Sequence, residues 1–142
     1  MTSPDPSEPL SASALGERLN VGEEQILERE ASGVLFSIVR PARMRGREYP
    51  AFQAWPGIAG VPLAQILKVL GAPATGGPAA YGFFTSKNDL LVDLTPIEVM
   101  VGRLTLQRAV DLLAQRLLAS TQAIRFNAVM GAARAYRADL DA

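Results

Sequence analysis

Two of the residue types most used in enzyme chemistry are missing from this sequence of 142 residues, so catalysis would have to rely on carboxylates, tyrosines, serines or lysines. It contains no cysteine and no histidine, so it lacks a thiolate nucleophile, the commonest metal ligand and the commonest general base. Asp89 and Asp93 are the only close carboxylate pair between expected helices, and aspartate is a common turn residue. Without a phosphate loop or a metal-ligand spacing, we expect a protein that is not an enzyme and binds no metal or cofactor.

Four arginines could instead contact phosphates. Arg40, Arg43, Arg45 and Arg47 stand against the single acid Glu48, a local excess that suits a nucleic-acid backbone. The whole chain gives no such preference, because 14 basic residues balance 14 acidic ones. Two interpretations stay open: the arginines grip DNA, or they form a solvated hairpin that supports a domain interface.

The elements that would position these arginines form a recognisable order. Ser11 is a suitable N-cap for a helix ending near Asn20, and Gly22 for a second helix that Gly33 stops. Residues 34–40 and 47–55 are β-rich and flank a turn with proline and glycine, and Pro50 predicts that the second strand lies at a sheet edge. A helix pair followed by a hairpin is the layout of a winged helix-turn-helix, as in excisionase-like and MerR-like DNA readers.

The second helix of this pair is a poor match to DNA. Its four glutamates would repel the phosphates that flank a major groove, and only Gln25 and Arg29 suit base edges. The candidate DNA-binding residues are Gln25, Arg29, Arg43, Arg45 and Arg47.

The rest of the chain has helical periodicity. We predict helices near residues 62–70, 79–84, 96–102, 105–119 and 121–136, with a flexible connection at 71–78. The last two should pair antiparallel. The predicted fold is mainly α: a disordered tail (1–9), a winged helix-turn-helix-like region with one β-hairpin (10–56), and a compact helical domain (57–142). The tail does not resemble a secretory signal and no apolar run has membrane-spanning length, so the expected location is the cytoplasm.

The residues that lead into one predicted helix, near residue 96, have an unusual composition. Thr95 is an N-cap, Pro96 takes the first helical position, and Glu98 completes a capping box. The preceding residues, Leu-Leu-Val-Asp-Leu, are far more apolar than a solvated loop requires. Leu91 and Leu94 therefore either fill the chain's own core or contact a partner.

Residues 81–104 around this helix start resemble the toxin-binding domain of the Xre/MbcA/ParS antitoxin family. That family's signature is an apolar helix, a loop containing asparagine, and Leu-Gly-Gly-x-Thr-Pro before a leucine-rich helix. The residues that fit it are Phe83, Phe84, Asn88, Leu91, Thr95, Pro96, Ile97, Glu98 and Met100. Val92 and Asp93 stand where the family has two glycines. The likeness extends over roughly residues 45–113.

The resemblance implies an antitoxin of a type II toxin-antitoxin pair, which neutralises a cognate protein toxin by direct binding. In this family the toxin is often a NAD-consuming enzyme of the RES class, and the antitoxin frequently binds its own promoter DNA through an N-terminal helix-turn-helix. We expect a homodimer or a larger hetero-oligomer with the toxin. The expected toxin-binding residues are Lys87, Asn88, Asp89, Leu91, Leu94 and Thr95. The alternative is a protein-binding adaptor or a DNA-binding transcriptional regulator without a toxin partner.

Overall fold

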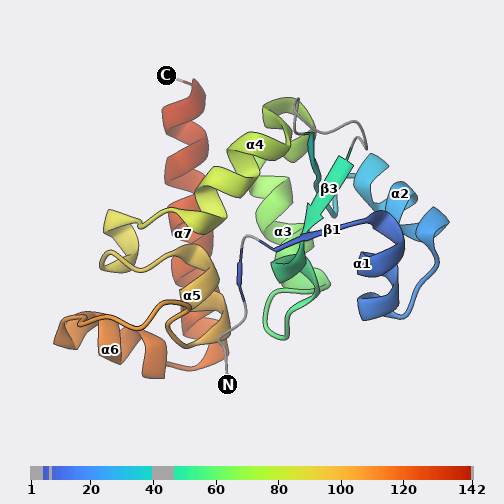
Figure 1. Cartoon of the computed structure of the whole chain (residues 1–142). Helices are drawn as coiled ribbons and strands as arrows, with labels where there is room; N and C mark the ends of the chain where they lie inside the picture. The colour runs from blue at the N-terminus through green and yellow to red at the C-terminus, as the bar shows by residue number, and fades with distance from the viewer. Residues whose placement is uncertain (1–4, 7, 40–46, 142) are drawn as a thin grey trace.

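The chain folds into helices arranged around one small antiparallel sheet (Figure 1). The computed structural model describes residues 5–6, 8–39 and 47–141. The predicted mainly α fold with a β-hairpin near its start is confirmed. None of the described helices is both long and apolar enough to cross a lipid bilayer.

The N-terminal elements follow the predicted order. They are β1 (Pro9–Leu10), α1 (Ala12–Leu19), α2 (Glu23–Ala31), β2 (Ile38–Val39) and β3 (Arg47–Pro50). The side chain of Ser11 caps α1 by accepting a hydrogen bond from the Ala14 amide at 3.1 Å, and Asn20 ends this helix in the left-handed conformation. Gly22 is the N-cap of α2. Both helix starts are therefore set locally, as the sequence indicated.

The sheet has the order β1-β3-β2, with all neighbours antiparallel. The prediction that Pro50 places its strand at an edge is wrong, because β1 pairs with the free side of β3 and makes it the central strand. Pro50 is the last residue of β3 and lies opposite Pro9, so its missing amide proton falls where the ladder ends. Pro9, expected in a disordered tail, belongs to β1.

The strands are shorter than predicted. Residues 34–37 lie outside β2, and Ala51–Ala54 forms a 3-10 helix, η1. The cause is the fully buried side chain of Gln53. Its Nε2 donates to the Phe36 carbonyl and its Oε1 accepts from the Phe36 backbone amide, each at 2.9 Å. The Gln53 side chain thus makes the two hydrogen bonds that a neighbouring strand would make to the Phe36 backbone, and no strand pairing is needed there.

The C-terminal elements are helical throughout. They are α3 (Val61–Leu70), α4 (Ala72–Thr85), the 3-10 helix η2 (Asp89–Leu91), α5 (Pro96–Val101), α6 (Leu112–Ala119) and α7 (Gln122–Asp141). The long helix α7 packs chiefly against α3 and α5, and the short helix α6 lies against α5 at one end of the molecule (Figure 1). The predicted pairing of two long antiparallel helices at the C-terminus is therefore wrong.

A tertiary contact explains that difference. The predicted helix at 105–119 begins only at Leu112, where Asp111 accepts a hydrogen bond from the Ala114 amide at 2.9 Å. Upstream, the Thr105 amide donates to the Glu98 carboxylate at 3.0 Å. This bond diverts the Thr105 amide from a helical ladder, so residues 103–111 stay irregular.

The predicted flexible connection at 71–78 is also wrong, because α4 begins at Ala72 and runs through it. Gly71 separates α3 from α4 with a left-handed φ of 68°. A proline is tolerated in the first turn of α4 because an amide proton there would have no hydrogen-bond partner within the helix. A Cβ atom at Gly77 would collide with the Ser37 carbonyl oxygen. Glycine here lets α4 lie directly on the segment that leads into β2.

A single cluster of buried apolar side chains connects the two predicted regions. At its centre, Phe52 lies 5.8 Å from Phe36 and 5.2 Å from Phe84 between ring centroids, and Phe83 lies 5.4 Å from Phe84. Residues from 10–56 and from 57–142 thus share one core. The boundary near residue 56 stays a prediction.

Candidate functional site

The loop between α4 and α5 is closed by its own hydrogen bonds. The Asn88 amide donates to the Leu94 carbonyl at 3.1 Å, and the Asn88 carbonyl accepts from Leu91 and Asp93. The Asn88 side chain also accepts from the Leu90 amide at 2.9 Å. Asn88, which the sequence predicts to bind a partner, is half-buried. Its hydrogen bonds hold the loop together.

Two consecutive residues of this loop have left-handed backbones. Val92 has a φ of 56° and Asp93 a φ of 64°. Aspartate tolerates this conformation, whereas a β-branched valine is rarely found there. The conformation costs roughly 1–2 kcal/mol for an ordinary L-residue. Leu91 and Leu94 flank the pair with 0% of their surface exposed, so their burial offsets the strain.

Burial separates the predicted contact residues into three groups. Lys87 and Asp89 are exposed, Asn88 and Thr95 are half-buried, and Leu91 and Leu94 are fully buried. Leu91 and Leu94 fill the core and cannot contact a partner in this structure, which is the first of the two possibilities that the sequence left open.

Sequence reasoning missed Leu90, which is 62% exposed. No local signal identified it, because which leucine of this run is exposed depends on the turn made by Val92 and Asp93.

The capping box at the start of α5 is present. Thr95 Oγ1 accepts from the Glu98 amide at 3.2 Å, and Glu98 Oε1 accepts from the Thr95 amide at 3.0 Å. Glu98 itself is completely buried, and the Arg108 guanidinium binds both of its oxygens at 2.7 Å. Glu98 therefore links the helix start to the irregular segment at residues 103–111.

The charge of Glu98 depends on these donors. Burial would raise the pKa of the Glu98 carboxyl, but hydrogen bonds from Arg108 and from the Thr95 and Thr105 amides outweigh it and lower the pKa to about 2. The carboxylate is thus ionised at every ordinary pH. This fixed ion pair gives Arg108 a structural task and makes it unavailable as a free cation.

Arg125 fixes the other end of α5. Its Nη1 donates to the carbonyls of Val99 and Met100 at 3.0 and 2.9 Å, and its Nε donates to the Ser120 carbonyl at 3.0 Å. Gly102 follows with a φ of 78°, and a Cβ atom there would lie 2.7 Å from Arg125 Nη1. Because both ends of α5 are anchored, the loop before it is presented on a rigid support.

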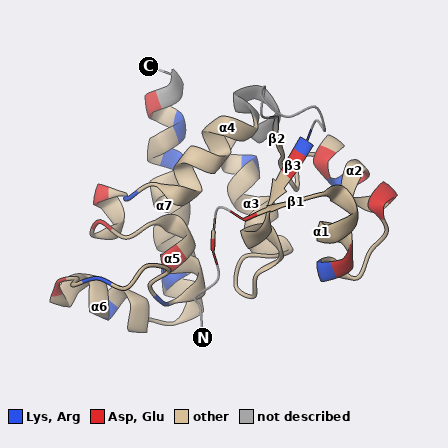
Figure 2. Ribbon diagram, viewed as in Figure 1, with Lys and Arg blue, Asp and Glu red and all other residues tan. Residues whose placement is uncertain are grey.

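The candidate DNA-binding surface is acidic where it is described. On α2, Glu23, Glu24 and Glu28 are exposed next to Gln25, and Arg29 is half-buried (Figure 2). Phosphates beside this helix would meet repulsion rather than attraction.

The predicted arginines of the hairpin divide between described and undescribed residues. Arg43 and Arg45 lie outside the described residues. Arg47 is described and donates to Glu30 at 2.9 Å, and Tyr49 donates to the same carboxylate oxygen at 2.7 Å. Burial and the bond to Glu30 raise the pKa of Tyr49, so its hydroxyl stays a donor. Arg47 thus joins the hairpin to α2 instead of facing solvent unpaired.

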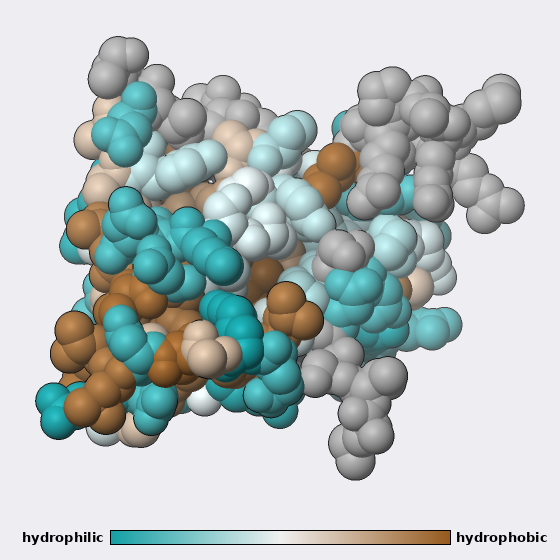
Figure 3. Space-filling model, turned by 60° about the vertical axis from the view of Figure 1, so that its left-hand side comes forward, coloured by the Kyte–Doolittle hydropathy of each residue, from teal (hydrophilic) through white to brown (hydrophobic). Residues whose placement is uncertain are grey.

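Large apolar side chains are exposed at several points of the described surface. Leu27 and Val61 lie on α2 and α3, and Leu90 lies on the loop. Four more belong to the stretch that contains α6 and the start of α7: Leu106, Leu112, Leu113 and Ile124. Brown side chains gather at the lower left of Figure 3, the view that brings the side of α5 and α6 forward.

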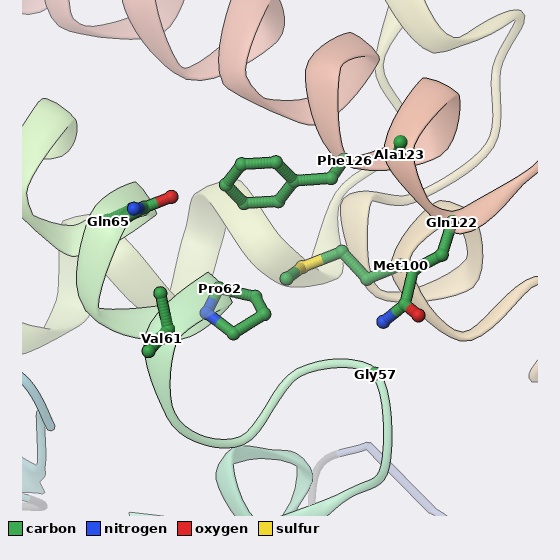
Figure 4. Close-up of a pocket in the computed structure, with 8 residues that line it drawn as sticks. All are labelled: Gly57, Val61, Pro62, Gln65, Met100, Gln122, Ala123 and Phe126. Atoms are coloured by element: carbon green, nitrogen blue, oxygen red, sulfur yellow. The ribbon is translucent and has the colours of Figure 1, made fainter.

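An open groove of about 390 Å³ lies between α3, the end of α5 and the start of α7 (Figure 4). Met100, Phe126 and Val61 form apolar walls, and the amide side chains of Gln65 and Gln122 are its longest polar groups. None of the described residues that line it is acidic or basic.

The described residues contain no group of three or more acidic side chains placed to hold a metal ion. No family model, no curated protein and no solved structure matches the chain. The functional argument therefore rests on the geometry of the loop, the buried ion pair and the exposed surfaces.

Proposed function

We propose that this chain is an antitoxin that neutralises a protein toxin by direct binding, through residues 87–90 and the start of α5. The observation that carries the proposal is the left-handed backbone of Val92 and Asp93. These residues stand where the Xre/MbcA/ParS family has two glycines, the residue type that favours this conformation. Two glycines would favour the conformation that Val92 and Asp93 adopt, so this backbone supports the resemblance.

The exposed part of the loop has the composition of a contact surface. Leu90 supplies an apolar side chain at 62% exposure, with Lys87 and Asp89 beside it. An apolar side chain with charged neighbours matches the apolar centre and polar rim of protein–protein interfaces. Because Asn88 and the α5 cap already order the loop, little conformational entropy is lost on binding.

Binding to promoter DNA has less support than binding to a toxin. The exposed acids of α2 repel phosphates, and Arg47 is paired with Glu30. The resemblance supplies the chemical class of the partner: a RES-like enzyme that consumes NAD. An antitoxin of this kind acts by occupying the toxin and needs no catalytic group of its own.

Co-expression with the protein from the neighbouring reading frame tests the proposal. If that protein is the toxin, it should arrest growth and deplete NAD when expressed alone, and this chain should restore both. A Leu90→Asp variant should fail to restore growth. The matched control is Leu27→Asp, which changes another exposed leucine, on α2, and should restore growth fully.

Two results would overturn the proposal. One is that the wild-type chain neither binds the neighbouring protein nor restores growth. The other is that Leu90→Asp, folded by circular dichroism, protects as well as Leu27→Asp does.

A further inference from the structure

The peptide group that joins Leu94 to Thr95 is hydrogen-bonded on both sides, and we call it the bridging peptide. Its carbonyl, on Leu94, accepts from the Asn88 amide at 3.1 Å. Its N–H, on Thr95, donates to Glu98 Oε1 at 3.0 Å. Because a peptide group is a rigid plane, a displacement of the Glu98 carboxylate on one side moves the acceptor of Asn88 on the other.

Asn88 in turn orients the backbone of Leu90, the exposed apolar residue of the loop. The Asn88 side chain accepts from the Leu90 amide at 2.9 Å, and its carbonyl accepts from the Leu91 and Asp93 amides. Asn88 therefore stands between the bridging peptide and the residue that we propose as the apolar contact. The position of Leu90 depends on where the bridging peptide lies.

This hydrogen-bond series begins outside the loop, in the irregular segment at residues 103–111. Arg108 Nη2 donates to Glu98 Oε1, the oxygen that also accepts from Thr95, and Nη1 donates to Oε2, both at 2.7 Å. Nη1 also donates to the Leu106 carbonyl at 3.1 Å, which fixes the guanidinium to its own segment. The side chain of Glu98 is only 1% exposed, so water does not compete with the guanidinium for the carboxylate.

We propose that Arg108 is a positioning residue for toxin binding, an inference that rests on the proposed function. It orients Leu90 through Glu98, the bridging peptide and Asn88. The planar guanidinium holds both carboxylate oxygens at once, which a lysine ammonium or a neutral amide does not. When the carboxylate is less firmly held, the loop opens more often and must be ordered again on binding. Ordering one backbone residue lowers the affinity by about tenfold.

Amide hydrogen exchange of the isolated chain tests the positioning without the toxin. In Arg108→Lys, which keeps a positive charge beside the buried carboxylate, the Leu90, Asp93 and Thr95 amides should exchange about tenfold faster than in wild type, by local opening. The matched control is Gln53→Ala, which removes two buried hydrogen bonds outside this series. It should speed these three amides no more than the amides of α7. Unchanged exchange of the three amides in Arg108→Lys would overturn the proposal.

The affinity for the purified protein from the neighbouring reading frame tests the consequence for binding. Arg108→Lys should bind about tenfold more weakly than wild type, whereas folded Gln53→Ala should bind like wild type. Asn88→Ala breaks the same series at its other end, so the double variant Arg108→Lys/Asn88→Ala should be little weaker than either single variant. Wild-type affinity of Arg108→Lys, or fully additive effects in the double variant, would contradict the positioning role.

The two experiments separate this inference from the proposed function. If the wild-type chain does not bind the neighbouring protein, the proposed function fails, and the exchange rates still decide whether Arg108 orders the loop. If the wild-type chain binds and Arg108→Lys binds equally well, the proposed function stands and the positioning role is wrong.

Discussion

The replacement Glu98→Gln removes the charge at the centre of the capped helix start while keeping the shape of the side chain. Glu98 is fully buried and receives bonds from Arg108, Thr95 and Thr105. The pKa of its carboxyl falls from 4.5 to about 2 in the folded chain. Since each pKa unit is worth about 1.4 kcal/mol, the ionised carboxylate contributes about 3 kcal/mol to the free energy of unfolding at neutral pH.

The sign of the pH dependence follows from this lowered pKa. The contribution is complete above the unfolded value of 4.5 and is lost as the pH falls towards about 2. Urea unfolding of wild type and Glu98→Gln, monitored by circular dichroism at several pH values, should therefore show a gap of about 3 kcal/mol at neutral pH. This gap should shrink steadily below pH 4.5.

The control is Glu28→Gln, which neutralises an exposed carboxylate beyond the first turn of α2 and should change stability by less than about 0.5 kcal/mol at each pH. The reasoning is refuted if the Glu98→Gln gap is the same at pH 7 and in strong acid. It is equally refuted if the gap at pH 7 is no larger than that of the control.

Three smaller predictions concern the backbone. Asp93→Gly should leave the unfolding free energy unchanged or raise it by up to about 1 kcal/mol, whereas Asp93→Val should lower it by about 1 kcal/mol, because φ is 64° there; chemical unfolding of both variants measures the difference. Gln53→Ala should cost about 2 kcal/mol or more by the same assay, since it leaves the buried Phe36 amide and carbonyl without partners. Thr95→Ala should lower the unfolding free energy by about 1 kcal/mol, read from urea unfolding, because it removes the cap of α5.

Features set by neighbouring residues could be predicted from the sequence. Ser11 and Asn20 mark the ends of α1, and Thr95 with Glu98 marks the start of α5, because each is a hydrogen bond or a backbone preference within a few residues. The change from helix to strand after Gly33 was visible for the same reason. Local chemistry thus gave the mainly α class and the helix-helix-hairpin order.

Features set by distant contacts could not be predicted. The irregular backbone of residues 103–111 depends on Glu98 binding Thr105 and Arg108, and neither bond has a local sequence signal. The central place of β3 depends on Pro9 and Leu10 returning to pair with it. In the candidate site, exposure of Lys87 and Asp89 agrees with their polar character, but which of the neighbouring leucines is exposed depends on the turn made by Val92 and Asp93.

The most direct test of the proposed function is a calorimetric titration of the purified protein from the neighbouring reading frame with this chain. The account predicts a defined complex with the wild-type chain, an equal affinity for Leu27→Asp, and an affinity at least about tenfold lower for Leu90→Asp, because a charge would replace the apolar anchor of the loop. Equal affinities for wild type and a folded Leu90→Asp variant would contradict the account and place the toxin-binding surface elsewhere.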